Sequence, residues 1–325
     1  MQAITVKRFG GPEVLELVEL PEPVPGPGEV LVQVEAIGVN PVETYIRAGT
    51  YPRLPALPYT PGGNVAGRVA ACGPGVSGWQ EGERVYSAAT LSGGYAELTL
   101  CSAEQIFALP ESHSFAEGAA IGVPAATAWR ALYLRGGARA GERVLVRGAS
   151  GSVGQAAVQL ARAGGMKVYG TAGTDQGCAV VRALGAEVFN HTRKECEAEL
   201  LATAGATGFD LILEMLANKN LDSDLSLLAP RGRVVIIGSR GRIEIDPRAT
   251  MGKETEIRGL AVFSATREET IATHRGLAEA MAAGVLVPAV ARELPLAEAA
   301  HAHHLVVGSG LCGKIILRPR STARP

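Results

Sequence analysis

The sequence contains little of what marks secreted, membrane-spanning or nucleic-acid-binding proteins. Its 325 residues include 5 cysteines, none in a CxxC pair, and the formal net charge is −1. An odd, scattered set of cysteines indicates reduced thiols rather than a disulfide framework. A net charge near zero gives no global attraction to nucleic acid or to a membrane surface. No window approaches 18 uninterrupted apolar residues, and the N-terminus lacks an apolar segment of signal-peptide length. We therefore expect a soluble, cytoplasmic protein.

The length of the chain suits one large or two medium domains, and the sequence pattern changes near residue 119. Residues 1–123 hold short apolar or alternating segments bounded by Gly and Pro, for example "AITVKRF", "EVLVQVEAIGVN" and "VAGRVAACG". Segments of this kind predict strands. We expect residues 1–123 to form a mainly β module, closed as a partly open barrel.

Strands and helices alternate in the next part of the chain. Six strands are expected there: "RVLVRG", "KVYGTAG", "EVFNH", "DLILEML", "RVVIIGS" and "EIRGLAVF". The alternation predicts an α/β fold, a doubly wound Rossmann domain with a six-stranded parallel sheet, over residues 124–263. Residues 264–325 are interpreted as a return of the chain to the first module, and their last segment, "RSTARP", as a frayed end.

The stretch "RVLVRGASGSVGQAA" joins the first of these strands to a helix. Gly148, Gly151 and Gly154 stand three residues apart, a variant of the GxGxxG pattern. In a strand–turn–helix unit such glycines let backbone amides approach a pyrophosphate, and the N-terminus of the helix favours negative charge. A glycine-rich turn alone is commonly just a tight connection, but here the strand and the helix provide the context that the motif requires. We predict a dinucleotide site.

The end of the second strand bears on which dinucleotide binds. A site selective for NAD places Asp or Glu there, about 20 residues past the glycines. This sequence has Thr-Ala-Gly-Thr at residues 171–174, so no carboxylate repels a 2′-phosphate, which favours NADPH. Asp175 is interpreted as a helix N-cap rather than as a ribose ligand. No Arg or Lys stands beside the strand end, and Lys167 and His191 are the nearest candidate cations.

Several longer segments carry a family resemblance. They include "GVNPVETYIRAGTYP", "LPYTPGGNVAG", "EMLANKNLDSDLSLL" and "GSGLCGKIIL", and with others they span nearly the whole chain. The chain resembles the zeta-crystallin family of zinc-free quinone reductases, which belongs to the medium-chain dehydrogenase/reductase superfamily. It departs from that family at "GGN", where Gly-Ser-Asp is expected, and at Ser152, where a loop glycine is expected. Neither departure removes a side chain that the chemistry needs.

The resemblance implies a GroES-like catalytic domain beside the Rossmann domain, and reduction of quinones, ortho-quinones by preference, by NADPH with one-electron products. It also implies a homo-oligomer, a tetramer or a dimer, and binding to AU-rich mRNA. The residues that we expect to bind the cofactor, from the motif and from the resemblance, are Tyr45, Gly148, Ser150, Gly151, Ser152, Val153, Gly154, Gly173, Thr174, His191, Asn218, Gly238, Ser239, Val262, Phe263 and Ser264.

A zinc site is not expected. Zinc-dependent relatives use a Cys, a Gly-His-Glu segment and four closely spaced cysteines, whereas this chain has "GGNVAG" in the corresponding place and no such cysteines. The segment "AEAAHAHHL" is the other candidate. On a helix His301 and His304 share a face, but no Cys or carboxylate completes a ligand set, so surface or packing roles are favoured for these histidines.

A quinone reductase needs few catalytic groups, because NADPH carries the chemistry. The protein must position the acceptor, exclude water and offer a hydrogen-bond donor to the oxygen on which charge develops. Tyr45 and Asn40, in one segment with Pro41, are our candidate donors; alternatively Tyr45 is a packed core aromatic.

Three other functions stay open. An NADPH-dependent reductase of enones or enoyl thioesters would share the fold and the cofactor, and comparing turnover of phenanthrenequinone with that of an enone would separate the two. An RNA-binding protein that uses its cofactor cleft would rest on resemblance alone, since the sequence shows no basic patch with interleaved aromatics. The sequence does not address a structural role in lens.

Overall fold

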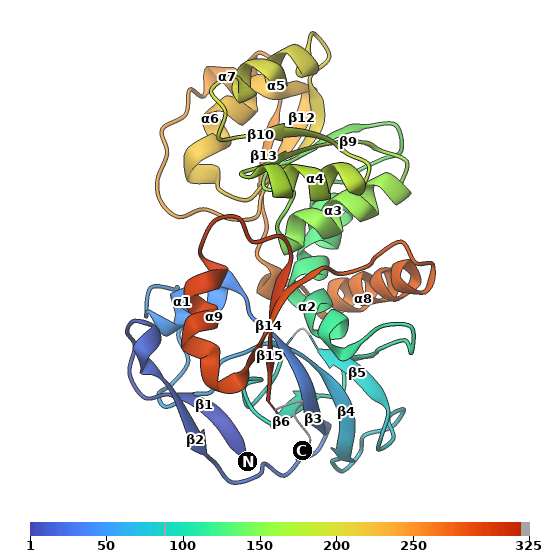
Figure 1. Cartoon of the computed structure of the whole chain (residues 1–325). Coiled ribbons are helices and arrows are strands. Elements are labelled where there is room, and N and C mark those ends of the chain that lie inside the picture. The colour runs from blue at the N-terminus through green and yellow to red at the C-terminus, as the bar shows by residue number, and fades with distance from the viewer. Residues whose placement is uncertain (88, 320–325) are drawn as a thin grey trace. The chain divides into compact units, whose positions relative to one another are not determined.

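The computed structural model describes residues 1–87 and 89–319, and the chain divides into two compact units. The first unit comprises Met1–Val123 and the chain from Pro288 onward, and the second comprises Pro124–Val287. The expected frayed end, "RSTARP", lies outside the described residues. Figure 1 follows the chain through both units.

The chain returns to the first unit at Pro288, not at residue 264 as we expected. Helix α8 (Arg267–Ala282) belongs to the second unit because two contacts hold it there. Arg130 Nη2 pairs with Glu269 Oε2 at 2.7 Å. A Cβ added to Gly276 would lie 2.1 Å from the Trp129 ring, so helix and ring are packed in close contact.

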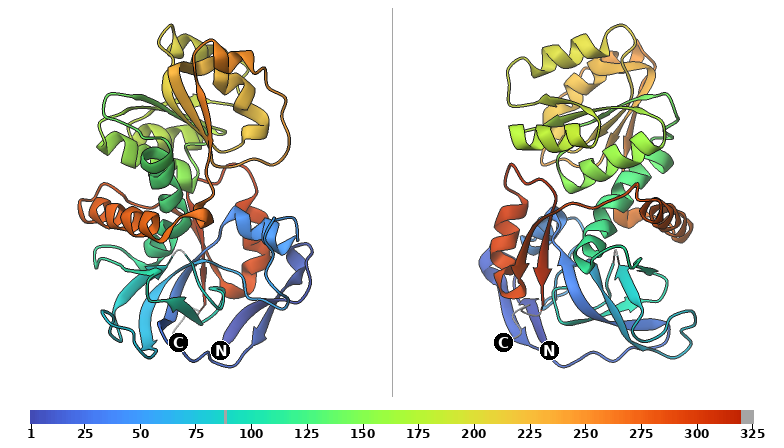
Figure 2. Two further views of the ribbon diagram at one scale, coloured as in Figure 1. Left: turned by 180° about the vertical axis from the view of Figure 1, so that it is seen from behind. Right: turned by 45° about the vertical axis from the view of Figure 1, so that its right-hand side comes forward.

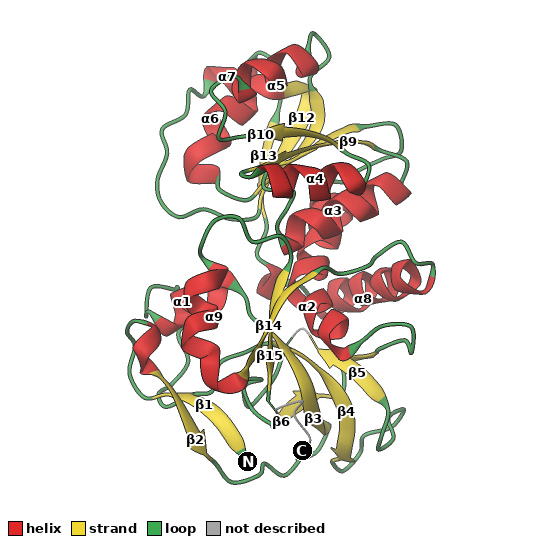
Figure 3. Cartoon of the chain, viewed as in Figure 1, coloured by secondary structure: helices red, strands yellow, loops and turns green. Residues whose placement is uncertain are grey.

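The first unit is built mainly of strands (Figure 3). In the described residues, seven strands form one sheet in the order β14-β15-β3-β4-β5-β7, with β6 paired to β3, while β1 and β2 form a separate antiparallel pair. The strands are β1 (Gln2–Val6), β2 (Leu15–Glu19), β3 (Glu29–Gly38), β4 (Asn64–Cys72), β5 (Arg84–Ser87), β6 (Leu98–Ser102), β7 (Ile106–Ala108), β14 (Val290–Pro295) and β15 (Lys314–Arg318). The helices are η1 (Pro12–Val14), α1 (Pro41–Arg47), η4 (Leu296–Glu298) and α9 (Ala299–Val306).

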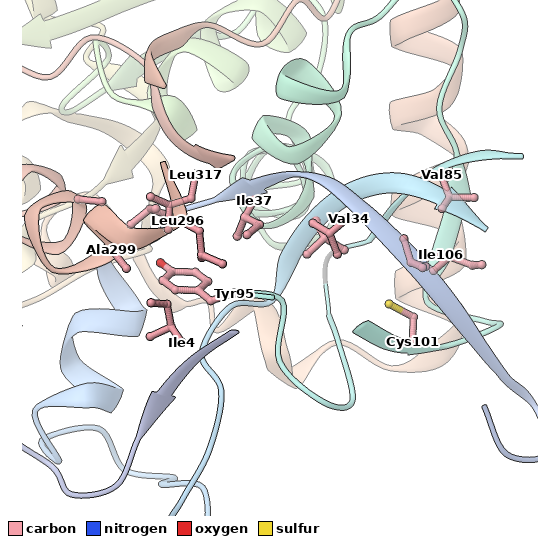
Figure 4. Packing of buried hydrophobic residues seen from close by; sticks show 14 of the residues in the cluster. Ile4, Val34, Ile37, Val85, Tyr95, Cys101, Ile106, Leu296, Ala299 and Leu317 are labelled. Atoms are coloured by element: carbon pink, nitrogen blue, oxygen red, sulfur yellow. The ribbon is translucent and has the colours of Figure 1, made fainter. Parts of the chain in front are cut away.

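Alternation along β3 places Val30, Val32 and Val34 in the core of this unit. Figure 4 shows the Tyr95 ring lying among Ile4, Leu296 and other apolar side chains of the same core. Tyr95 is fully buried, so its hydroxyl requires partners inside the unit.

The second unit contains a parallel sheet with the strand order β10-β9-β8-β11-β12-β13. In sequence order this is 3-2-1-4-5-6, the order of a doubly wound dinucleotide-binding fold, and helices lie on both faces of the sheet (Figure 2). The predicted fold class is confirmed. The strands are β8 (Arg143–Val146), β9 (Lys167–Ala172), β10 (Glu187–Asn190), β11 (Phe209–Glu214), β12 (Leu228–Ile236) and β13 (Glu256–Gly259). The helices besides α8 are α3 (Ser152–Ala163), α4 (Asp175–Ala183), α5 (Cys196–Ala204), α6 (Ala217–Leu227), α7 (Arg248–Met251) and η3 (Val262–Ser264).

Helix α2 (Phe115–Trp129) contains Pro124 and continues as a π-helical segment, η2 (Arg130–Arg135). The sequence predicts a helix here with a start or a kink at that proline; the structure keeps Pro124 inside the helix. Among the described residues, no helix has both the length and the apolar character that crossing a bilayer requires.

Candidate cofactor and acceptor sites

The glycine loop follows β8 directly and is hydrogen-bonded to the end of β9. Gly148 has a φ of +64°, in the left-handed region that favours glycine. Its N–H donates to Thr171 Oγ1 at 3.1 Å, and the N–H of Ala149 donates to the Thr171 carbonyl at 2.7 Å. Thr171 therefore holds the glycine loop against the end of β9.

The N-terminus of α3 is open to an anion. Gly151 is the N-cap and has no side chain to accept from the first turn. Backbone N–H groups in the first turn of a helix have no partner within the helix, so those of Ser152 and Val153 suit a pyrophosphate as hydrogen-bond donors. Gly154 lets the helix approach the loop, because a Cβ there would lie 2.4 Å from the Gly148 carbonyl oxygen.

The ends of β9 and β10 bring Gly173 and His191 together. A Cβ on Gly173 would lie 2.8 Å from His191 Nε2. Burial, and to a smaller extent Arg147, lower the pKa of His191, so this imidazole is neutral at physiological pH and offers a hydrogen bond rather than a charge. Lys167 begins β9 and so lies at the opposite end of that strand from Gly173.

The N-cap of α4 is Thr174, not Asp175 as we predicted. Thr174 Oγ1 accepts from the Gly177 N–H at 3.0 Å, and Asp175 is the first residue of the helix. A threonine hydroxyl competes well for this position, so the cap lies one residue earlier.

Arg193 is a cation that the sequence reasoning missed. Its Nη2 lies 3.2 Å from Asp175 Oδ1, beside the first turn of α4, and both side chains are largely exposed. An exposed ion pair of this kind is weak, so the guanidinium can leave it for a phosphate. The signal in the sequence is the position of Arg193, two residues past His191.

The remaining predicted cofactor residues of the second unit follow the ends of β11, β12 and β13. Asn218 Oδ1 accepts from the Arg240 N–H at 2.8 Å, which fixes the segment that contains Gly238 and Ser239. A Cβ on Gly238 would lie 2.4 Å from the Met215 carbonyl oxygen. Residues 262–264 form η3, where Phe263 is exposed. All six strand ends thus present predicted residues at the carboxyl edge of one parallel sheet, where such folds bind ligands.

A buried network of charged side chains includes Arg147, the residue that directly precedes the glycine loop. Arg147 is 2% exposed; its Nε lies 2.9 Å from Asp224 Oδ1 and its Nη1 lies 2.9 Å from Glu197 Oε1. Asp224 and Glu214 are fully buried. Burial raises the pKa of Asp224, Arg147 opposes this rise, and Glu214 adds to it. Arg147 thus joins three carboxyl groups, two of them fully buried, beside the start of the glycine loop.

In the first unit Asn40 is buried at the start of α1, where it forms a capping box with Glu43. Its Nδ2 donates to the Gly38 carbonyl at 3.2 Å and to Glu43 Oε1 at 3.1 Å, and its Oδ1 accepts from Lys314 Nζ. Both amide hydrogens are therefore in use, and Asn40 has none to offer an acceptor. This geometry favours a positioning role over the donor role we expected.

Tyr45 lies on α1, one turn past Asn40, and is half-buried. No described residue forms a hydrogen bond with its hydroxyl, in contrast to that of Tyr95, which donates to Glu43 Oε2 at 2.7 Å. A half-buried phenol with a free hydroxyl remains available as a hydrogen-bond donor.

Two family models match separate parts of the chain: an alcohol dehydrogenase GroES-like domain at residues 26–111 and a zinc-binding dehydrogenase at residues 152–279. A human quinone oxidoreductase is 50% identical over 320 residues, 98% of this chain and 97% of the relative. A crystal structure of a quinone oxidoreductase from Pseudomonas syringae is 28% identical, with a TM-score of 0.90 over 98% of this chain and 99% of that one. A mycobacterial protein solved in complex with NADPH is 30% identical, with a TM-score of 0.89 over 98% and 100%.

A GroES-like unit joined to a doubly wound dinucleotide-binding unit defines a medium-chain dehydrogenase/reductase, an oxidoreductase that uses a nicotinamide cofactor. Within that class, the 50% sequence identity to a quinone oxidoreductase over nearly the full length shows that the chain belongs to the quinone oxidoreductase family. The resemblance seen in the sequence is confirmed.

The described side chains do not fit the zinc named in one family description. No three His, Cys, Asp or Glu side chains within residues 1–87 and 89–319 gather as a metal would require. His303 is buried and its Nε2 lies 3.0 Å from the Tyr95 hydroxyl, whereas His301 and His304 are exposed.

Proposed function

We propose that the chain is an NADPH-dependent, zinc-independent quinone reductase with ortho-quinones as preferred acceptors. The observation that carries the cofactor preference is the end of β9, where Gly173 lies against neutral His191 and no carboxylate stands in the position that NAD-selective sites use. The acceptor class rests on the names of the relatives. The homo-oligomer and the binding of AU-rich mRNA stay predictions, and no described contact favours the enone-reductase alternative.

Bound NADPH would supply a hydride from its nicotinamide ring. The N–H groups of Ser152 and Val153, at the start of α3, would hold the pyrophosphate, and Arg193 would leave Asp175 to meet the 2′-phosphate. Tyr45 would donate its hydroxyl hydrogen to the acceptor oxygen on which charge develops. Asn40 would fix the start of the helix that carries Tyr45.

NADPH is expected to bind at least about tenfold tighter than NADH, which corresponds to about 1.4 kcal/mol. Gly173→Asp should lower NADPH affinity and narrow this ratio, because the new carboxylate repels the 2′-phosphate. Fluorescence titration of both cofactors measures the dissociation constants. Gly173→Asn is the matched control, since its Cβ meets His191 in the same way but carries no charge. Equal affinities of the wild type for NADPH and NADH would contradict the cofactor assignment.

Tyr45→Phe is expected to lower kcat/KM for quinones by about 3- to 30-fold, or roughly 0.6 to 2 kcal/mol, with NADPH affinity nearly unchanged. The loss is modest because a quinone is already electron-poor. Steady-state kinetics with several quinones measure it. Tyr133→Phe is the control, since that hydroxyl donates to the Leu160 carbonyl inside the second unit. Full activity in Tyr45→Phe would remove the donor role and leave Tyr45 as a packing residue.

A further inference from the structure

Lys314 is a buried lysine that the proposed function does not use. It is the first residue of β15 and is 3% exposed. Strand β15 pairs with β3 so that Ile316 faces Gly38, and the Val39 N–H donates to the Ile315 carbonyl at 3.0 Å. Continuing this antiparallel register by two residues places Lys314 directly across from Asn40. A Cβ on Gly38 would lie 2.9 Å from Lys314 Cε, so glycine there leaves room for the lysine side chain.

A chain of hydrogen bonds runs from Lys314 into α1. Lys314 Nζ donates to Asn40 Oδ1, and Asn40 Nδ2 donates to Glu43 Oε1. The Asn40 backbone N–H also donates to Glu43 Oε2, at 2.9 Å. Lys314 is therefore connected to the first turn of the helix that carries Tyr45.

The same series of hydrogen bonds extends from Glu43 to α9. The Tyr95 hydroxyl donates to Glu43 Oε2, so it accepts from His303 Nε2. Burial, with Arg47 and His304, lowers the pKa of His303 to about 3, which keeps this ring neutral. Glu43 is thus held from both sides, by Asn40 and by Tyr95.

A buried ammonium is an expensive way to stabilise a fold. Desolvation disfavours its charge, and an apolar side chain of similar length would fill the space without that cost. Burial lowers the pKa of Lys314 to about 7, and Glu43 opposes this shift. Gly38 and Asn40 contact Lys314, and neither carries a charge. Asn64, which pairs with Gly38 from β4, is also uncharged. Tyr95 contacts Glu43 rather than Lys314, and the neutral His303 contacts Tyr95. Glu43 is therefore the charged group that acts on Lys314.

We propose that Lys314 is a positioning residue, which through Asn40 and Glu43 fixes the start of α1 and thereby the place of Tyr45 at the acceptor. The inference rests on the proposed function. An ammonium donates a stronger hydrogen bond to Asn40 Oδ1 than a neutral amine does. The hold on α1 is therefore tightest when Lys314 is protonated, and it weakens as the pH rises through the pKa of Lys314.

The test compares kcat/KM of the full-length wild type and of Lys314→Met for phenanthrenequinone with NADPH, from pH 6 to pH 9. We expect Lys314→Met to be about tenfold slower at pH 6 and within about threefold of the wild type at pH 9. Dividing the two profiles removes the pH dependence of the quinone itself. Lys7→Met is the matched control, an exposed lysine of the same unit paired with Glu16, and should follow the wild type. NADPH affinity should stay within about twofold throughout.

Glu43→Gln is the second variant. Glutamine keeps an oxygen that accepts from Tyr95 but removes the negative charge that supports the Lys314 ammonium. The pH profile of kcat/KM of this variant should therefore have its midpoint at lower pH than that of the wild type. This result does not depend on Lys314→Met folding.

Folding stability gives an independent readout of Lys314. Its pKa is lower in the folded chain than the ordinary 10.5, so the unfolded chain binds more protons between about pH 7 and pH 10.5. The stability of the wild type relative to Lys314→Met should therefore rise with pH across this window, as urea titrations at pH 6 and pH 9 would measure.

A ratio of wild type to Lys314→Met that stays constant from pH 6 to pH 9, or a variant with wild-type kcat/KM, would overturn the inference while leaving the proposed function intact. A wild-type chain inactive towards quinones would overturn the proposed function, and this inference with it.

Discussion

Asp224→Ala is expected to lower the free energy of unfolding by about 3–5 kcal/mol, because it leaves the buried Arg147 guanidinium without the fully buried carboxylate that it contacts directly. Arg147 Nε lies 2.9 Å from Asp224 Oδ1, and both side chains are almost fully buried. Glu197 also contacts Arg147, but its side chain is 49% exposed and so compensates less. Urea denaturation followed by circular dichroism measures the change.

Two control variants separate the charge from the shape of Asp224. Asp224→Asn keeps an oxygen that can accept from Arg147 and fills the same space, so it should cost clearly less than the alanine variant. Glu16→Ala removes an exposed partner of Lys7 and should cost less than about 1 kcal/mol. Equal small losses for Asp224→Ala and Glu16→Ala would show that the network contributes little to stability.

The Arg147 network also bears on cofactor binding. Arg147 directly precedes Gly148, and its partners come from α5 and α6. The network thus joins two helices to the strand end where the glycine loop begins. Asp224→Ala should therefore weaken NADPH binding as well as stability, in the same protein preparation.

Much of the second unit could be predicted from the sequence, since each strand is a short apolar run and the glycine spacing places the loop. The end of the domain could not. The pattern of "TREETIATHRGLAEAMAAG" predicts a helix whichever domain it belongs to. Its place is decided by contacts of Glu269 and Gly276 with Arg130 and Trp129, which lie far away in the chain. Tertiary contacts of this kind leave no local signal.

The polar networks show a similar division. Asn40 followed three residues later by Glu43 is a capping-box pattern that the sequence offers openly. The pairing of Lys314 with Asn40 depends on the register of β15 against β3, which no pattern in either segment specifies. The sequence therefore indicated that Asn40 matters, but the structure was needed to see that its amide hydrogens are already used.

Gly154→Ala is expected to raise the dissociation constant for NADPH about 100-fold, which corresponds to about 2.7 kcal/mol. The added Cβ would lie 2.4 Å from the Gly148 carbonyl oxygen and 2.5 Å from Ala149 Cα, both backbone atoms that cannot rotate away. Helix α3 or the loop must shift, and the N–H groups that hold the pyrophosphate shift with it. Fluorescence titration measures the affinity, and urea denaturation should show a loss of stability in the same variant.

Gly151→Ala distinguishes ligand approach from packing. A Cβ there would meet nothing closer than the Gly148 carbonyl oxygen at 3.5 Å, and the φ of −75° suits alanine. Stability should change by less than about 1 kcal/mol, while NADPH affinity falls about tenfold because the methyl group enters the space beside the N-terminus of α3. Gly252→Ala, with its nearest atom at 3.9 Å and no part in the loop, should change neither quantity. If Gly154→Ala bound NADPH as the wild type does, the close contact of α3 with the loop would not be what shapes the site. If Gly151→Ala bound NADPH as tightly as the wild type while Gly154→Ala did not, the pyrophosphate would lie elsewhere on the carboxyl edge of the sheet.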